Sequence, residues 1–210
     1  MNRNRFFVTG TDTGIGKTIV STTLTIGLHA KYWKPIQTGS IEGTDSNFVK
    51  EWAGANSVLP ETYVFKTPVS PHLASKLEDQ TIDLDKVLSE LRAYTGDLII
   101  EGAGGVHVPI DSGFLLSDLI QKTELPVIVA VNLRLGCINH TLLTLEALRS
   151  RQIPVTGFIS VGENNVESSR SIEEYGHAQC LGHIPHCPSF TKDFFATAFQ
   201  NLALENLCPN

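Results

Sequence analysis

A glycine-rich stretch that ends in Gly-Lys-Thr, residues 10–18, constrains this chain more than any other feature. It follows an apolar run at residues 6–8 that predicts a strand, and it precedes residues 19–28, whose apolar side chains share one helical face. In a turn between a strand and a helix, backbone N–H groups point at one spot, where the helix dipole favours negative charge. The stretch is therefore predicted to be a phosphate-binding loop, although five residues separate its first glycine from its Gly-Lys pair, where the general pattern has four.

Two side chains of this loop predict a nucleotide that is bound together with a metal ion. Lys17 is placed to contact β- and γ-phosphate oxygens, and the Thr18 hydroxyl suits Mg²⁺ as a ligand. We expect the loop to bind the nucleotide through Gly14, Ile15, Gly16, Lys17, Thr18 and Ile19.

The rest of the chain alternates between apolar runs of strand length and helical patterns. Strands are predicted at residues 5–9, 32–34, 97–101, 126–132, 154–160 and 180–184. Helices are predicted at residues 45–52, 71–77, 84–91, 115–122, 140–151 and 167–175. Strands that are apolar throughout and separated by helices favour a parallel sheet covered on both faces. The expected fold is a three-layer α/β fold of the P-loop NTPase type with a mainly parallel sheet, and residues 1–210 are expected to form one domain.

One predicted strand ends in an acid followed by a glycine-rich turn. Ligands of parallel sheets bind at the carboxyl ends of the strands, so the residues there are candidate site residues. Glu101 ends the strand at 97–101 and can hold Mg²⁺ beside the phosphate-binding loop. The turn after it lets the backbone approach an anion closely through Gly102, Ala103 and Gly104.

Three other positions stay open when each is considered alone. Lys34 ends a second strand and is either another cation at the transferred phosphoryl group or an ordinary solvated lysine. Asp45 is either a site carboxylate or a helix N-cap. Residues 136–140 are expected to form a loop that leads into a helix, with Asn139 as its N-cap.

Composition argues against several classes of function. The net charge of −6 does not favour a nucleic-acid partner, and no apolar run approaches the length that spans a membrane. Arg3 and Arg5 precede only three apolar residues, so we expect no signal peptide and a cytoplasmic location. The four cysteines form no Cys-x-x-Cys pair, and free thiols are expected at Cys137, Cys180, Cys187 and Cys208. Zinc binding by the Cys and His residues of segment 180–187 is disfavoured because their spacing is irregular and a glycine and a proline interrupt it.

Taken together, these segments resemble the dethiobiotin synthetases, a family of biotin biosynthesis. The matching pieces occur in the family order along nearly the whole chain, and the five-residue spacing in the phosphate loop is the family's own. They are Val8-Thr9-Gly10-Thr11-Asp12-Thr13 with Gly16-Lys17-Thr18, Lys34-Pro35 with Thr38-Gly39, Ser70-Pro71-His72, Glu101-Gly102-Ala103-Gly104-Gly105, Leu135-Gly136-Cys137-Ile138-Asn139-His140, and Leu181-Gly182 with Ile184-Pro185.

The resemblance implies a seven-stranded, mainly parallel sheet and a homodimer. It implies ATP- and Mg²⁺-dependent closure of a ureido ring, from 7,8-diaminononanoate (7,8-diaminopelargonate) and CO₂ to dethiobiotin, ADP and phosphate. Lys17 and Lys34 would be catalytic, and the metal would be held by Thr18, Asp45 and Glu101. Further nucleotide contacts are implied for Ile184, Pro185 and His186, and substrate contacts for Thr13, Thr38, Cys137, Ile138, Asn139 and Tyr175, with the last four acting across the dimer interface.

The chain departs from the family pattern at three places. The segment from Lys17 to Lys34 is shorter than usual, and His186 replaces an aromatic residue. Val161 stands where the family typically has an asparagine that reads adenine, so either backbone groups near residues 184–185 hold the base, or Asn164 or Asn165 reads it.

Two other functions are alternatives to the one that this resemblance implies. An amidoligase or cobyrinate-type synthetase usually carries a separate glutamine-hydrolysing domain, for which 210 residues leave no room. A nucleotide switch of the partitioning or metal-insertion type is the alternative from another class. Partitioning ATPases commonly carry a lysine at the position of Asp12, and GTPases an Asn-Lys-x-Asp segment that residues 131–134 do not match.

Overall fold

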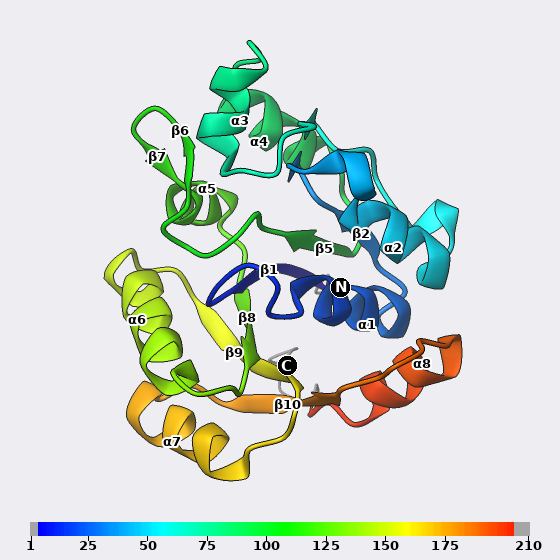
Figure 1. Ribbon diagram of the computed structural model, residues 1–210, viewed down its shortest axis with the longest axis vertical. Coiled ribbons are helices and arrows are strands. Elements are labelled where there is room, and N and C mark those ends of the chain that lie inside the picture. Colours follow the sequence, from blue (N-terminus) through cyan, green and yellow to red (C-terminus); the bar gives the residue numbers. More distant parts are fainter. Residues whose placement is uncertain (1–3, 204–210) are drawn as a thin grey trace.

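Six parallel strands form the centre of the molecule, in the order β10-β9-β8-β1-β5-β2 (Figure 1). The computed structural model describes residues 4–203, so Arg3 and Cys208 lie outside the described residues. The strands are β1 (Arg5–Gly10), β2 (Lys31–Trp33), β5 (Leu98–Glu101), β8 (Val127–Asn132), β9 (Val155–Gly162) and β10 (Cys180–Pro185). All six predicted strands are present, with bounds within two residues of those predicted.

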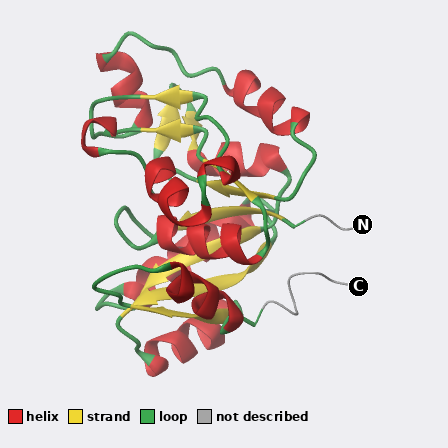
Figure 2. Cartoon of the chain, turned by 90° about the vertical axis from the view of Figure 1, so that its right-hand side faces the viewer, coloured by secondary structure: helices red, strands yellow, loops and turns green. Residues whose placement is uncertain are grey.

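Helices cover both faces of this sheet, which gives the three layers that the sequence predicts (Figures 1 and 2). On one face, α1 (Lys17–Gly27) and α8 (Lys192–Gln200) pack on Val8, Ile128 and Ile159. On the other face, a larger core joins the sheet to α4 (Leu84–Ala93), α5 (Leu116–Thr123), α6 (Cys137–Ser150) and α7 (Val166–Gly176). The alternation of side chains along each buried strand explains how one strand serves both cores.

Short elements lie outside this frame. The central sheet of the described chain has six strands, so the seventh strand that the resemblance implied is not part of it. After β2 the backbone reaches Pro35, which has no N–H to extend a ladder, and the chain leaves the sheet. The other short elements are β3 (Ile36–Gln37) paired with β4 (Tyr63–Val64), β6 (Pro109–Asp111) paired with β7 (Phe114–Leu115), the 3₁₀ turns at Ser40–Glu42 and Ala55–Ser57, α2 (Asp45–Ala53) and α3 (Pro71–Leu77).

The predicted helices are all present, with one boundary in error and one helix missed. The helix predicted from residue 140 begins three residues earlier, at Cys137, because Gly136 adopts a left-handed φ of 94° and turns the chain directly into α6. Asn139 therefore lies in the first turn of α6 and is not its N-cap. The helix that was not predicted is α8.

The sheet topology places the predicted site residues at one edge. β1 lies between β5 and β8, and Val8 pairs with Glu101, so the loop after β1 begins beside the carboxyl end of β5. β2 pairs with β5 on the other side, which brings Lys34 to the same edge.

Within residues 4–203, no helix is long and apolar enough to span a membrane. Among the described cysteines, Cys137, Cys180 and Cys187 are free thiols, as predicted.

Candidate active site

The phosphate-binding loop connects β1 to α1 and has the open geometry that an anion requires. Gly14 and Gly16 have φ values of 71° and 100°, which side chains rarely adopt. No side chain caps the N-terminus of α1, so the first N–H groups of this helix face a cavity of about 760 Å³. A Cβ atom at Gly16 would lie 2.8 Å from the Val161 side chain, so the loop also needs glycine for space.

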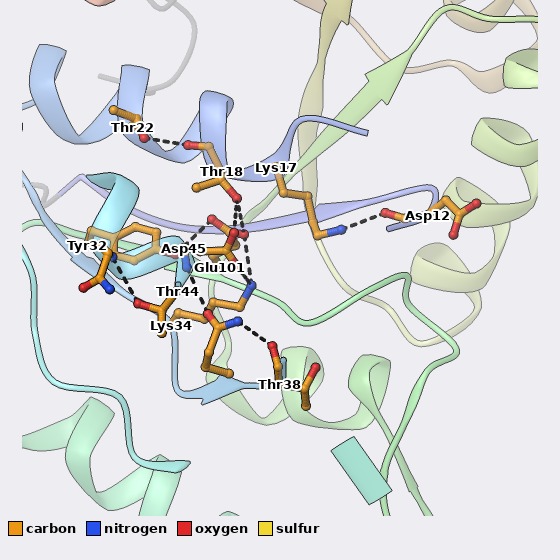
Figure 3. Close-up of polar contacts among 12 residues, drawn as sticks. Asp12, Lys17, Thr18, Thr22, Tyr32, Lys34, Thr38, Thr44, Asp45 and Glu101 are labelled. Carbon is orange, nitrogen blue, oxygen red and sulfur yellow. Dashed lines mark hydrogen bonds and ion pairs between the residues drawn. The ribbon is translucent and has the colours of Figure 1, made fainter. Parts of the chain in front are cut away.

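Lys17 reaches across this loop from the first position of α1. Its Nζ donates a hydrogen bond to the carbonyl oxygen of Asp12 at 2.7 Å, and the side chain is buried (Figure 3). Burial lowers the pKa of the Lys17 ammonium, and the positive charge of Lys34 lowers it further, against the opposing effect of Glu101. A phosphate group would supply the negative charge that the ammonium lacks in this position.

A compact cluster of charged groups lies next to the loop (Figure 3). The Thr18 hydroxyl lies 2.7 Å from Oδ1 of Asp45 and 3.0 Å from Oε1 of Glu101. Lys34 Nζ contacts Oδ2 of Asp45 and lies 3.3 Å from Oε1 of Glu101. Four segments distant in sequence thus meet here: the start of α1, the end of β2, the start of α2 and the end of β5.

Lys34 and Asp45, which the sequence left open, both lie at this cluster. Lys34 is 6% exposed, so it is not an ordinary solvated lysine. Thr44 is the N-cap of α2, where its side chain accepts a hydrogen bond from the N–H of Asn47, so Asp45 is the first residue of the helix and its carboxylate faces the cluster. Both residues are therefore available to the site.

The charges in the cluster balance one another. Burial alone would lower the pKa of Lys34, but the carboxylates of Glu101 and Asp45 outweigh it, and the pKa is raised. Burial alone would raise the pKa of Asp45, but the Lys34 ammonium outweighs it, and the pKa is lowered. The Lys34 ammonium and the Asp45 carboxylate therefore both carry their charge at neutral pH.

The oxygen atoms of this cluster suit a hard divalent cation. A hydroxyl from Thr18 and carboxylates from Asp45 and Glu101 converge within hydrogen-bond distance, and Mg²⁺ prefers oxygen ligands of this kind. Among residues 4–203, no group of three or more His, Cys, Asp or Glu side chains could hold a metal ion. A metal here would therefore depend on the hydroxyl and on a ligand such as phosphate, as is usual for Mg²⁺.

Most of the predicted site residues line the cavity. They are Thr13, Gly14, Gly16, Lys17, Thr18, Ile19, Lys34, Thr38, Asp45, Glu101, Ala103 and Gly104. Two others lie behind its wall: Ile15 is buried in the core, and Gly102 packs where a Cβ atom would meet Leu116 and Phe7 at 2.9 Å. Ser70 and Pro71 also line it, so the cavity extends from the phosphate loop to the start of α3.

The remaining predicted residues are not among those that line this cavity. Ile184 is buried at the end of β10, followed by the exposed Pro185 and His186. Cys137, Ile138 and Asn139 form the first turn of α6, and Tyr175 is an exposed residue of α7. Within one chain, the four predicted substrate residues on α6 and α7 therefore do not line the cavity at the phosphate loop.

Several residues of the cavity were not predicted. Gln37, Phe48, Val108 and Phe190 line it, and Phe190 lies edge-on to Phe48 with ring centroids 5.4 Å apart. Tyr32 lies behind it and donates a hydrogen bond to Glu101 at 3.0 Å. Burial and the charge of Glu101 raise the pKa of Tyr32 well above its usual range. A signal for Tyr32 exists in the sequence, because it precedes Lys34 by two residues on a strand and therefore shares its face.

Sequence similarity relates this chain to proteins of known family. The sequence pattern of the family described as "AAA domain" matches residues 4–193. The ATP-dependent dethiobiotin synthetase BioD of Agrobacterium fabrum is 45% identical over 197 residues, which cover 93% of this chain and 92% of that protein. The ATP-dependent dethiobiotin synthetase BioD of Lawsonia intracellularis is 44% identical over 200 residues, which cover 95% of each chain.

Solved structures with a similar fold have distant sequences. The MinD cell division protein of Aquifex aeolicus matches with a TM-score of 0.58 and 16% identity, over 97% of both chains. A ParA family ATPase from Chlorobium tepidum matches with a TM-score of 0.58 and 12% identity, over 96% of this chain and 92% of that one. At this identity the likeness establishes the P-loop α/β fold and nothing about activity.

Proposed function

Because this chain belongs to the family of ATP-dependent dethiobiotin synthetases, which are ligases of biotin biosynthesis, we propose that it closes the ureido ring of dethiobiotin from 7,8-diaminononanoate and CO₂. ATP is consumed, and ADP and phosphate are released. The observation that carries the proposal is the meeting of the phosphate loop with Lys34, Asp45 and Glu101 in one cavity. We also propose that residues 1–210 form one domain.

The proposed reaction has three steps. One amine of the substrate adds to CO₂ and loses a proton, giving a carbamate. A carbamate oxygen then attacks the γ-phosphorus of ATP, and the bond to the ADP oxygen breaks, giving a carbamic–phosphoric anhydride. The second amine attacks the carbonyl carbon of this anhydride, phosphate leaves with the electron pair of the broken C–O bond, and the amine proton passes to solvent.

The residues of the cavity fit these steps through charge and position. Catalysis of phosphoryl transfer consists mostly of holding the reactants in line and neutralising charge. In this proposal Lys17 faces the β- and γ-phosphates, and Lys34 faces the γ-phosphate and the carbamate. Thr13 and Thr38 line the same cavity and would contact the diamine or carbamate. A magnesium ion held by Thr18, Asp45 and Glu101 would neutralise phosphate charge.

A direct assay tests the proposal. The purified protein is incubated with diamine, ¹³C-bicarbonate, ATP and Mg²⁺, and dethiobiotin with the label in its ureido carbon is sought by mass spectrometry. We expect labelled product only when all four components are present. Absence of product from a folded protein that binds ATP would refute the proposed reaction.

The alternative is a nucleotide switch of the partitioning or metal-insertion type. The fold resembles that of MinD and ParA proteins, but at 12–16% identity this likeness does not extend to function. The two proposals differ in what limits ATP consumption. A switch hydrolyses ATP steadily without diamine, whereas the proposed synthetase requires diamine for turnover, so phosphate release measured with and without diamine separates them.

Removal of a carboxylate from the cluster should weaken the use of Mg²⁺. Glu101→Gln and Asp45→Asn each delete a negative charge from the proposed ligand set, so the Mg²⁺ concentration for half-maximal turnover should rise roughly tenfold or more. Asp85→Asn, on the exposed surface of α4, is the matched control and should leave the titration unchanged. Unchanged Mg²⁺ titrations in both cluster variants would mean that the carboxylates serve only to hold Lys34.

A homodimer should bring the predicted substrate residues of α6 and α7 to a neighbouring cavity. Leu135, just before α6, and Leu143, on α6, are exposed apolar side chains, and Tyr175 on α7 is exposed too. Burial of this surface against a second copy would complete the binding site for the diamine's carboxylate. Light scattering under assay conditions is expected to give the mass of a dimer, and an active species of monomer mass would contradict this arrangement.

The protein should discriminate only weakly between the bases of different nucleoside triphosphates. Val161 is buried against the phosphate loop and offers no hydrogen bond, and Asn165 already accepts one from the N–H of Ser168 as the N-cap of α7. An apolar contact discriminates far less than a hydrogen-bonding side chain. We expect kcat/KM for ATP, GTP and CTP to agree within roughly tenfold, about 1.4 kcal/mol. A preference for ATP of roughly a hundredfold would instead direct attention to Asn164.

A further inference from the structure

Tyr32 forms a buried hydrogen bond that the proposed reaction does not yet explain. It lies on β2, its side chain is fully buried, and its hydroxyl donates to Oε2 of Glu101 at 3.0 Å (Figure 3). β2 and β5 are parallel and Tyr32 pairs with Ile99, so Glu101, two residues further along, shares the face of Tyr32. The strand register thus aims the phenol at this carboxylate.

The two oxygens of Glu101 have different neighbours. Oε1 faces the charged cluster, where it lies 3.0 Å from the Thr18 hydroxyl and 3.3 Å from Lys34 Nζ. Oε2 faces into the protein, and among the described residues its hydrogen-bond donor is the Tyr32 hydroxyl. A carboxylate that is only 1% exposed needs a donor for each oxygen, because an unpaired buried oxygen is costly.

We propose that Tyr32 is a positioning residue, which holds the inner oxygen of Glu101 so that the outer oxygen is presented to the metal–nucleotide complex. This inference rests on the proposed function only in taking the ligand to be a nucleoside phosphate with Mg²⁺. Tyr32 touches no substrate itself; it acts through the orientation of Glu101. The phenol hydroxyl donates the hydrogen bond to Glu101, which a phenylalanine of the same shape would lack.

The experiment compares nucleotide binding with and without metal. The affinity of Tyr32→Phe for ADP is measured by calorimetry, once with Mg²⁺ and once with EDTA. The affinity in Mg²⁺ should fall about tenfold, because the hydrogen bond to a charged group is lost, while the affinity in EDTA stays unchanged. Equal affinities of wild type and variant in Mg²⁺, or an equal loss under both conditions, would overturn the inference.

A matched control and a double variant separate positioning from packing. Tyr63→Phe removes another buried phenol, whose oxygen accepts a hydrogen bond from the N–H of Asp83 away from the cluster, and should leave both ADP affinities unchanged. In a Glu101→Gln background, Tyr32→Phe should have much less effect on the Mg²⁺-dependent affinity than in the wild type. Full additivity of the two substitutions would contradict action through Glu101.

The readouts also keep this inference apart from the proposed reaction. ADP binding needs no diamine, so the result stands even if no dethiobiotin is formed. If Tyr32→Phe does not fold, Tyr32→Met provides an apolar side chain without a donor, and the same loss of Mg²⁺-dependent affinity is expected. Conversely, a synthetase that forms dethiobiotin but binds Mg·ADP equally with or without the phenol would leave Tyr32 a packing residue.

Discussion

Lys17→Ala should lower turnover roughly 10³-fold or more, which corresponds to about 4 kcal/mol of lost transition-state stabilisation. The Lys17 ammonium is buried at the phosphate loop, where charge on a phosphoryl group is stabilised far more strongly than in water. The loss should appear in kcat for dethiobiotin formation, measured by mass spectrometry at saturating ATP and diamine.

The fold of this variant should survive. Burial lowers the pKa of Lys17, which means that the charged side chain is held in the loop at a cost to folding. The melting temperature of Lys17→Ala should therefore lie close to that of the wild type, and exposed Lys50→Ala on α2 provides the control for removal of a lysine. A Lys17→Ala enzyme with near-normal turnover would show that the loop does not bind the reacting phosphates.

Lys34→Ala should reduce kcat by roughly 10²–10³-fold, the usual cost of removing one group that stabilises developing charge. Lys34→Arg should restore little of this, because a planar guanidinium does not replace a compact ammonium between two carboxylates. The kinetic split is informative: an effect confined to kcat places the lysine at the transition state, and an effect on KM alone would assign it to ground-state binding.

Lys34→Ala should also alter stability, unlike Lys17→Ala. Its removal leaves Glu101 buried and Asp45 partly buried without their cation, which should destabilise the fold by up to about 3 kcal/mol. Added Mg²⁺ should recover part of this loss, as measured by thermal unfolding in EDTA and in Mg²⁺. Full activity and unchanged unfolding would mean that Lys34 serves neither role.

The sequence predicts the frame of this molecule well because its signals are local. The six strands of the central sheet are recognisable as largely apolar runs, and the phosphate loop is marked by its glycines. Glu101 could be placed at the site because it ends a strand next to the loop in a parallel sheet. Each of these predictions needs only a few neighbouring residues and a general rule of topology.

The residues that the sequence did not identify depend on contacts across the fold. Tyr32 gains its role from Glu101, 69 positions away, and Phe190 lines the cavity because α8 packs beside α1. The error at α6 was local in origin, because a left-handed Gly136 begins the helix without help from Asn139. Burial of Lys34 likewise follows from the pairing between β2 and β5. The sequence around Lys34 alone therefore does not distinguish a solvated lysine from a site lysine.

The contact between Gly16 and Val161 has a consequence for how such a chain can diverge. A Cβ atom at position 16 would lie 2.8 Å from Val161, so the loop and the end of β9 share one small space. A larger residue at position 161 would push on the phosphate loop, and a side chain at position 16 would push on β9. In lineages descended from this chain, position 161 is therefore constrained in volume for as long as the loop must bind phosphate.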